Sequence, residues 1–157
     1  MVVADIGTCA RLSKWKRMEQ ELIVKLIWKD ADMVEARMSA WNGQFGGTVD
    51  MYLGYGVLGE FAEALDGFPR TAGDKRDFQL GDLDNDGSGG ALLSLHTVDL
   101  AGHIAATLTL GTGTRLGPNQ EVTLQSSIEA AAVDRFVSEL WTMCDEVGSV
   151  ALLRFNS

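Results

Sequence analysis

Apolar residues recur at every second position through most of this 157-residue chain, and that alternation constrains its fold more than any other feature. A period of two places alternate side chains on opposite faces of a β-strand, so each such segment has one face to bury. Val34, Ala36 and Met38, for example, alternate with Glu35 and Arg37. The pattern predicts strands at residues 21–29, 33–41, 48–55, 75–81, 91–99, 103–110, 120–126 and 150–155.

Helical spacing occurs in only two segments. In residues 56–68 four apolar side chains fall at i, i+3, i+4 and i+7, and Gly67 and Pro69 then end the pattern. A longer stripe follows a Ser126-x-x-Glu129 sequence that has the form of a capping box. This second stripe consists of Ile128, Ala132, Val133, Phe136, Val137, Leu140, Trp141 and Cys144, so Cys144 is expected to be a buried structural thiol.

Runs of strands interrupted by single helices indicate the α+β class. We expect a mostly antiparallel sheet of about six or seven strands with two helices packed against it. Residues 18–157 are interpreted as one domain, whereas residues 1–17 are interpreted as a flexible tail or a mis-assigned start. No apolar run approaches the length of about 18 residues that a membrane helix needs, so no membrane partner is expected. The two cysteines, Cys9 and Cys144, do not suggest a disulfide framework, and we therefore expect a reducing, cytoplasmic compartment.

The net charge of −9 is unevenly distributed. Residues 1–17 hold four of the 13 basic residues, and the remainder holds 21 of the 22 acidic ones. An acidic body repels nucleic-acid phosphates, which argues against DNA or RNA as the ligand. The same charge would attract a basic protein, although solubility alone also accounts for it.

The sequence GDLDNDGSGG at residues 81–90 resembles a calcium loop, with Asp82, Asp84 and Asp86 as candidate metal ligands. Position 12 of that loop should be a bidentate glutamate, but it is Leu93 here. The flanking segments are also strand-like where the motif requires helices. A hairpin turn is therefore favoured over a metal site, and no cofactor is expected.

The two histidines, His96 and His103, flank Asp99 in a predicted hairpin. Imidazole and carboxylate groups can bind zinc or transfer protons, but a catalytic zinc site usually has three well-placed protein ligands. A structural role is therefore favoured over a catalytic one. We keep these three residues as candidates for a binding surface.

Four aromatic residues, Trp41, Phe45, Tyr52 and Tyr55, surround the glycine-rich segment of residues 42–47. Tryptophan and tyrosine often anchor protein interfaces, so exposed members of this group would form a binding patch. Packing of a sheet against its helices accounts for the same residues.

The order of these features resembles that of WapI-like bacterial immunity proteins and related small domains. The resemblance covers roughly residues 20–146 and includes a glycine-containing strand that enters a helix with Phe61 and Leu65, followed by an Asp99-x-x-Gly102-His103 hairpin. It implies a non-enzymatic protein that binds and neutralises a bacterial toxin, for which a basic toxin domain would be the partner.

Three alternatives remain open at this stage. The chain could be a small-molecule-binding protein or an enzyme with a pocket between sheet and helices, near His96 or His103. It could also be an accessory protein of unknown role from a mobile gene cassette, since one fold can serve many functions. Exposed strand edges leave a homodimer open as well.

Overall fold

The computed structural model describes residues 18–83 and 87–156. The order of elements along the chain is β-β-β-α-β-β-β-β-α-β, as the apolar spacing predicted. The elements are β1 (Glu21–Lys29), β2 (Met33–Trp41), β3 (Gly46–Gly54), α2 (Val57–Leu65), β4 (Lys75–Gly81), β5 (Gly90–Thr97), β6 (Ile104–Gly111), β7 (Glu121–Ile128), α3 (Ala130–Met143) and β8 (Val150–Arg154). The predicted tail at residues 1–17 lies outside the described residues.

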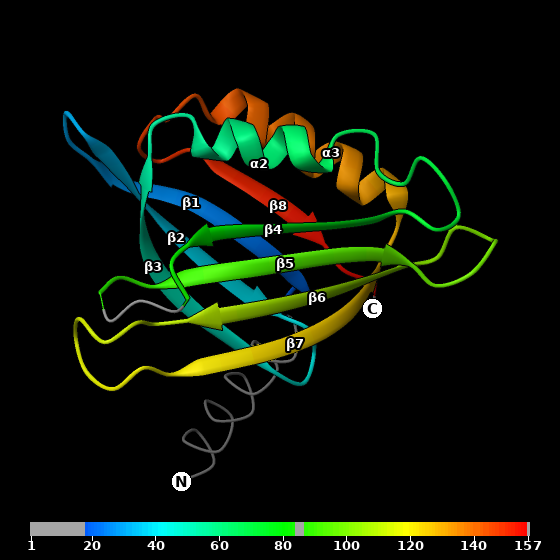
Figure 1. The fold of residues 1–157 in the computed structure, drawn as a ribbon, viewed down its shortest axis with the longest axis horizontal. Coiled ribbons are helices and arrows are strands. Elements are labelled where there is room, and N and C mark those ends of the chain that lie inside the picture. The colour runs from blue at the N-terminus through cyan, green and yellow to red at the C-terminus, as the bar shows by residue number, and fades with distance from the viewer. Residues whose placement is uncertain (1–17, 84–86, 157) are drawn as a thin grey trace, which may run out of the picture.

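The eight strands form two antiparallel sheets of four, which corrects the expectation of one sheet with six or seven strands. Sheet A has the order β3-β2-β1-β8, and sheet B has the order β4-β5-β6-β7 (Figure 1). Strand β3, at the edge of sheet A, contacts every strand of sheet B. The α+β class and the antiparallel pairing are confirmed. Alternation shows that a segment is a strand, but the partners of that strand depend on tertiary packing.

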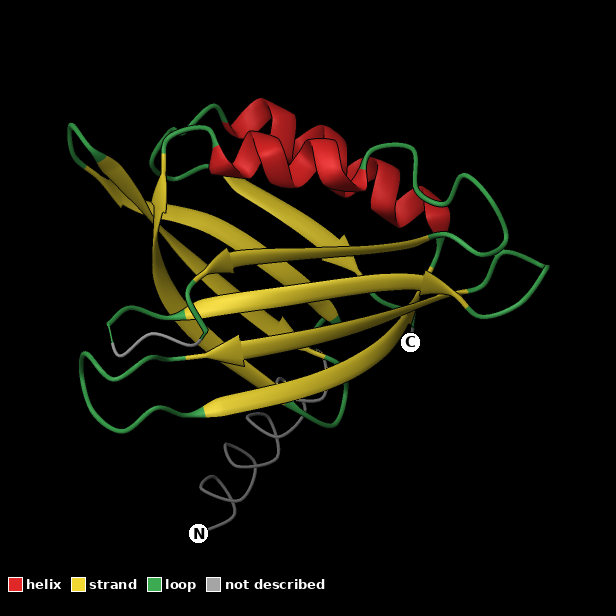
Figure 2. Cartoon of the chain, in the orientation of Figure 1, coloured by secondary structure: helices red, strands yellow, loops and turns green. Residues whose placement is uncertain are grey.

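The two helices lie together along one side of the stacked sheets, as Figure 2 shows. Helix α2 packs beside β4 of sheet B, helix α3 packs beside β8 of sheet A, and the two helices contact each other. They therefore cover the side on which the sheets' other edge strands lie. None of the helices in the described part of the chain is long and apolar enough to cross a membrane.

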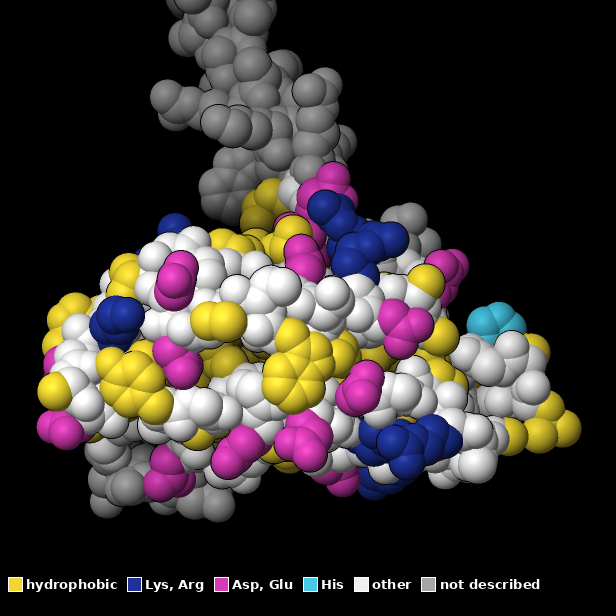
Figure 3. Space-filling view, turned by 90° about the horizontal axis from the view of Figure 1, so that it is seen from above, with side chains coloured by type: hydrophobic (Ala, Val, Ile, Leu, Met, Phe, Trp, Pro, Cys, Tyr) yellow, Lys and Arg dark blue, Asp and Glu magenta, His cyan; other side chains and the backbone are white. Residues whose placement is uncertain are grey.

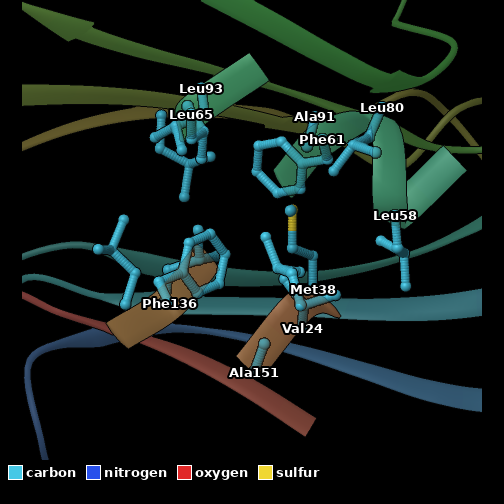
Figure 4. Packing of buried hydrophobic residues seen from close by; sticks show 14 of the residues in the cluster. Val24, Met38, Leu58, Phe61, Leu65, Leu80, Ala91, Leu93, Phe136 and Ala151 are labelled. Atoms are coloured by element: carbon cyan, nitrogen blue, oxygen red, sulfur yellow. The ribbon is translucent and has the colours of Figure 1, made fainter. Parts of the chain in front are cut away.

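Side chains from both sheets and both helices form one continuous apolar core. Figure 4 shows Phe61 of α2 and Phe136 of α3 among core side chains from both sheets, including Met38 of sheet A and Leu93 of sheet B. The Phe61 ring stacks on Phe78 with centroids 5.1 Å apart and meets Phe136 edge-on at 5.6 Å. The Phe61–Phe78 contact joins α2 to sheet B, and the Phe61–Phe136 contact joins the two helices to each other.

Trp28 corrects the pattern expected for the first strand. Alternation placed it on the buried face with Leu22, Val24 and Leu26, but its side chain is 43% exposed. The register of β1 against β2 shifts between Leu26 and Trp28. Such a bulge reverses the face on which later side chains lie, so Trp28 lies on the outer face of sheet A opposite Glu35.

Both ends of α2 are stabilised by residues from other elements. At the N-terminus, the Asp145 carboxylate accepts a hydrogen bond from Gly56 N (3.2 Å), where a negative charge is favourable. At the C-terminus, the Arg76 guanidinium donates to the carbonyls of Ala64 and Asp66. Asp74 holds that guanidinium with an Nη2–Oδ2 distance of 2.9 Å. A helix of nine residues needs such support because short helices are marginal in water.

The start and end of α3 differ from the sequence prediction. Ser126 and Ser127 belong to β7, and the helix begins after Glu129 without a side-chain cap, so the predicted capping box is wrong. Ile128 is also in β7, where it pairs with Ile104. At the other end Cys144 adopts a left-handed conformation and is exposed, which corrects the expectation of a buried thiol.

The Asp74–Arg76 contact predicts a pH-dependent contribution to stability. Hydrogen bonds from the Arg76 side chain, and then from the Arg70 backbone, lower the pKa of Asp74 below its ordinary value. A carboxylate with a lowered pKa in the folded state stabilises the protein above its unfolded pKa of about 3.9, and that contribution is lost as the pH falls through the folded value. We expect Asp74→Asn to lower the free energy of unfolding by about 1–2 kcal/mol at neutral pH.

Urea denaturation of both proteins at neutral pH and at about pH 2 measures this effect, and the difference should vanish at the lower pH. Asp77→Asn is the control, since Asp77 makes only an exposed ion pair with Lys75 (3.9 Å) and should change stability by less than about 1 kcal/mol. If Asp74→Asn lowers the free energy of unfolding equally at both pH values, the loss does not come from the charge of the Asp74 carboxylate.

Two glycines predict opposite effects of the same substitution. A Cβ on Gly89 would lie 2.7 Å from the carbonyl oxygens of Asp50 and Gly111, so Gly89→Ala should destabilise the fold by about 2 kcal/mol or more. A Cβ on Gly59 would meet Trp141 at an ordinary 3.7 Å. Gly59→Ala should instead stabilise α2 by about 0.5–1 kcal/mol, because alanine favours the helix. Thermal unfolding of the two variants compares them directly, and equal midpoints would contradict the packing described for Gly89.

Candidate functional site

The acidic loop at residues 81–90 connects two strands, which confirms the hairpin interpretation. Gly81 of β4 pairs with Gly90 of β5, and Asp82 N donates to the Gly89 carbonyl (3.3 Å). Asp84 and Asp86 lie outside the described residues. Within residues 18–83 and 87–156, no three His, Cys, Asp or Glu side chains gather as metal ligands would.

The histidine hairpin brings together two of its three predicted residues. His103 Nδ1 lies 2.5 Å from Asp99 Oδ2 at the exposed turn between β5 and β6, and this hydrogen bond lowers the pKa of Asp99. His96 lies within β5, between Lys75 and Ala105 of the neighbouring strands. Its side chain alternates with the buried Leu95, so it lies on the outer face of sheet B, away from the helices. The region between sheets and helices near the Phe61 ring is filled by core side chains.

The predicted aromatic group is divided between the two ends of the β2–β3 hairpin. Trp41 ends β2, and Phe45 follows in the turn with 61% of its surface exposed. Tyr52 lies six residues beyond the Trp41–Gly46 pair, or about 20 Å along the strand. Tyr55 follows β3 and donates to the Asp30 carbonyl. These four residues therefore do not form a single patch around the glycine-rich turn.

A different surface has the composition of a docking site. We call it the helix face: the exposed side of α2, α3 and their flanking turns, residues 56–66 and 129–146. These ranges contain eight acidic residues and a single basic one, Arg135. Figure 3 views this side of the molecule, where acidic side chains are spread over the face and Lys and Arg lie toward its margins.

Trp141 provides the apolar centre of the helix face. Its indole is 49% exposed and lies against Gly59 of α2, so it bridges the two helices. A Cβ on Gly59 would meet the ring at an ordinary contact distance of 3.7 Å, so the ring lies beside the α2 backbone without excluding an alanine there. Asp134 and Ser138 lie on the same side of α3, at i−7 and i−3 from the tryptophan. Asp145 follows the end of the helix, where it caps α2.

Two of the acids on the helix face have structural partners, and others are presented to solvent. Asp145 caps α2, and Glu139 Oε1 accepts a hydrogen bond from Leu152 N on the edge of β8 (3.1 Å). Glu60, Glu63 and Asp134 are exposed. The helix face thus combines a fixed aromatic group with exposed negative charge, which is an arrangement suited to binding a basic partner rather than to chemistry.

The apolar stripe of α3 predicts a buried Trp141, but this side chain is half exposed. Leu140 and Trp141 are adjacent, and consecutive residues on a helix differ by about 100°. Leu140 is buried at 2% exposure, so its neighbour turns toward the edge of the stripe. The signal that could have identified it was the combination of that edge position with polar residues at i−7 and i−3, Asp134 and Ser138.

Searches against protein-family models, curated proteins and solved structures give no match to this chain. The resemblance to WapI-like immunity proteins therefore stays a prediction.

The exposure of Trp141 predicts that this residue is not needed for folding. Trp141→Ala should lower the free energy of unfolding by about 1 kcal/mol or less, because half of the side chain is already in water. Phe136→Ala, one turn earlier and fully buried, should cost about 3–5 kcal/mol. Chemical denaturation of both variants gives the comparison. If the two substitutions lower the free energy of unfolding equally, Trp141 belongs to the core.

Proposed function

We propose that this chain is a non-enzymatic protein-binding domain that neutralises a basic toxin domain by docking it on the helix face. The single observation that carries the proposal is the half-exposed Trp141 surrounded by exposed carboxylates. Tryptophan is among the residues that contribute most to the affinity of protein interfaces, and it does so best when charged groups surround it at a polar rim.

Charge supports a basic partner. The chain carries −9, and the helix face has eight acids against one base. Such a surface attracts a cationic protein over distances comparable to the Debye length of about 10 Å at moderate salt, which accelerates the encounter. Toxin domains that cleave nucleic acids carry basic surfaces because they bind phosphates. An acidic protein of this size can cover such a surface.

Rigidity of the surface also supports docking. Helix α2 is capped by Asp145 and Arg76, and α3 is joined to β8 through Glu139. Side chains that are already ordered lose less conformational entropy when a partner binds, so a larger share of the contact energy contributes to affinity. Trp141 lies beside Gly59, between these two helices. We place the protein in the cytoplasm, where an immunity protein would meet an incoming toxin.

Growth rescue tests the function. Where a neighbouring gene encodes a toxin domain, that domain is induced in bacteria with and without this chain, and the two purified proteins are titrated calorimetrically. We expect growth to be restored and the affinity to fall with rising salt. If growth is not restored and the two proteins do not bind, the immunity proposal is contradicted.

Variants of the helix face then test the docking surface. Trp141→Ala and the double variant Glu60→Lys/Glu63→Lys should each weaken binding by about tenfold or more. Asp77→Lys is the matched control, since it reverses one exposed acid on sheet B and should change the affinity by less than about threefold. Rescue and binding that persist in every helix-face variant would place the interface elsewhere while leaving the immunity function intact.

A further inference from the structure

The outer face of sheet A carries a long hollow that is separate from the helix face. Its larger part, about 740 Å³, lies over Glu35, Arg37 and Asp50 and is overhung by the β6–β7 loop. A second part of about 450 Å³ lies over Ile23 and Trp41. Ser39 and Thr48 line both parts, so they form one continuous groove, which we call the outer furrow.

Strand register determines which side chains form its floor. Across β2 and β3, Glu35 is opposite Tyr52, Arg37 opposite Asp50, and Ser39 opposite Thr48. These pairs alternate with buried residues, so all three are on the outer face. From the Glu35 pair to Trp41 the furrow follows β2 for about 20 Å, which is long enough for several units of a chain-like ligand.

The middle of the furrow is a row of paired hydrogen-bonding groups. Arg37 donates to both carboxylate oxygens of Asp50, with distances of 2.8 and 3.1 Å. Thr48 Oγ1 donates to Ser39 Oγ at 3.0 Å. The bidentate contact fixes both planar groups and raises the pKa of Arg37. Their remaining lone pairs and N–H groups are on an exposed face, where a ligand with hydroxyl groups can use both.

Aromatic side chains lie at both ends. At one end the Trp41 ring lies against Gly46, where an added Cβ would be 2.9 Å from the indole Cε3. At the other end Arg115 from the overhanging loop lies over the Tyr52 ring, 4.9 Å from its centroid, and donates to its hydroxyl. Trp28 meets the same tyrosine edge-on at 6.2 Å. These contacts hold the aromatic groups in fixed orientations.

The charges in the larger part of the furrow balance. Arg37 is neutralised by Asp50. The hydrogen bond to Tyr52 raises the pKa of Arg115, and the negative charge of Glu35 adds to that rise. A polyanion would meet the two carboxylates, and a polycation would meet the two guanidinium groups, so neither is favoured. A peptide that adds to a sheet uses the backbone of an edge strand, whereas side chains form this floor. In the smaller part, Glu19 and Glu21 line the furrow and both pair with Arg154, at 3.4 and 3.7 Å. A neutral chain that has hydroxyl groups and apolar C–H faces fits the balanced larger part and the aromatic ring of Trp41.

We propose that the outer furrow binds a neutral oligosaccharide, with a sugar ring packed on Trp41 and hydroxyl groups bonded to the Arg37–Asp50 pair. The ligand spans several sugar units because its two anchoring regions are about 20 Å apart. This site does not depend on the proposed toxin binding, which uses the opposite, helix-covered side of the core.

Calorimetric titration of the full chain with cellohexaose, maltohexaose and chitohexaose tests the proposal, with glucose and an extended Gly-Ser decapeptide as comparison ligands. We expect at least one hexasaccharide to bind with a dissociation constant of about 1 mM or lower, which is typical of a shallow polar site. Glucose should bind at least about tenfold more weakly, since it cannot reach both anchoring regions.

Trp41→Ala and Asp50→Asn should each weaken the hexasaccharide by about fivefold or more. Thr123→Ala, on the outer face of sheet B, is the control and should leave binding unchanged. Melting temperatures show whether each variant is folded. If Trp41→Ala does not fold, the affinity of Asp50→Asn alone tests the furrow. No heat from any of the three hexasaccharides at about 10 mM would overturn the proposal. Binding that the furrow variants do not weaken, or that only the decapeptide shows, would overturn it too.

Discussion

The aromatic contact between the two helices and the two sheets is the feature on which the rest of the structure depends. Each sheet has one apolar face, and Phe61 and Phe136 extend the core to the side that the helices cover. Because both rings are fully buried, α2 and α3 cannot move independently of the sheets. The apolar area removed from water provides most of the stability. It also fixes which residues of the helices remain outside, among them Trp141.

Polar contacts then orient what the core holds in place. Asp145 and Arg76 satisfy the two ends of α2, and Glu139 covers part of the edge of β8. An edge strand with free N–H groups can pair with another chain, so this contact also protects the protein against association through β8. The same carboxylates that stabilise the helices add to the negative potential of the helix face. On the helix face, the same carboxylates therefore contribute both to the stability of the helices and to the negative surface charge.

Two surfaces with different chemistry follow from one arrangement of strands. The helix face is acidic and has one aromatic centre, whereas the outer furrow on sheet A is charge-balanced and elongated. The furrow exists because β2 and β3 expose one face and the β6–β7 loop crosses its end, with Arg115 over Tyr52. The glycine-rich loops pack closely there, since Gly89 approaches the Asp50 and Gly111 carbonyls where no side chain would fit. Because the helix face and the outer furrow lie on different parts of the surface, a ligand on one leaves the other accessible.

For residues 18–83 and 87–156, the sequence by itself determined the ten elements, their order and most of their buried faces, because periods of two and of 3.6 residues are local properties of the chain. It also indicated that residues 81–90 form a turn. Only the tertiary structure decided that the strands divide into two sheets, that a bulge turns Trp28 outward, and that Ile128 ends a strand instead of starting a helix. It alone separated Trp41 from Tyr52 and exposed Trp141. These outcomes depend on contacts between distant segments, which no local pattern records.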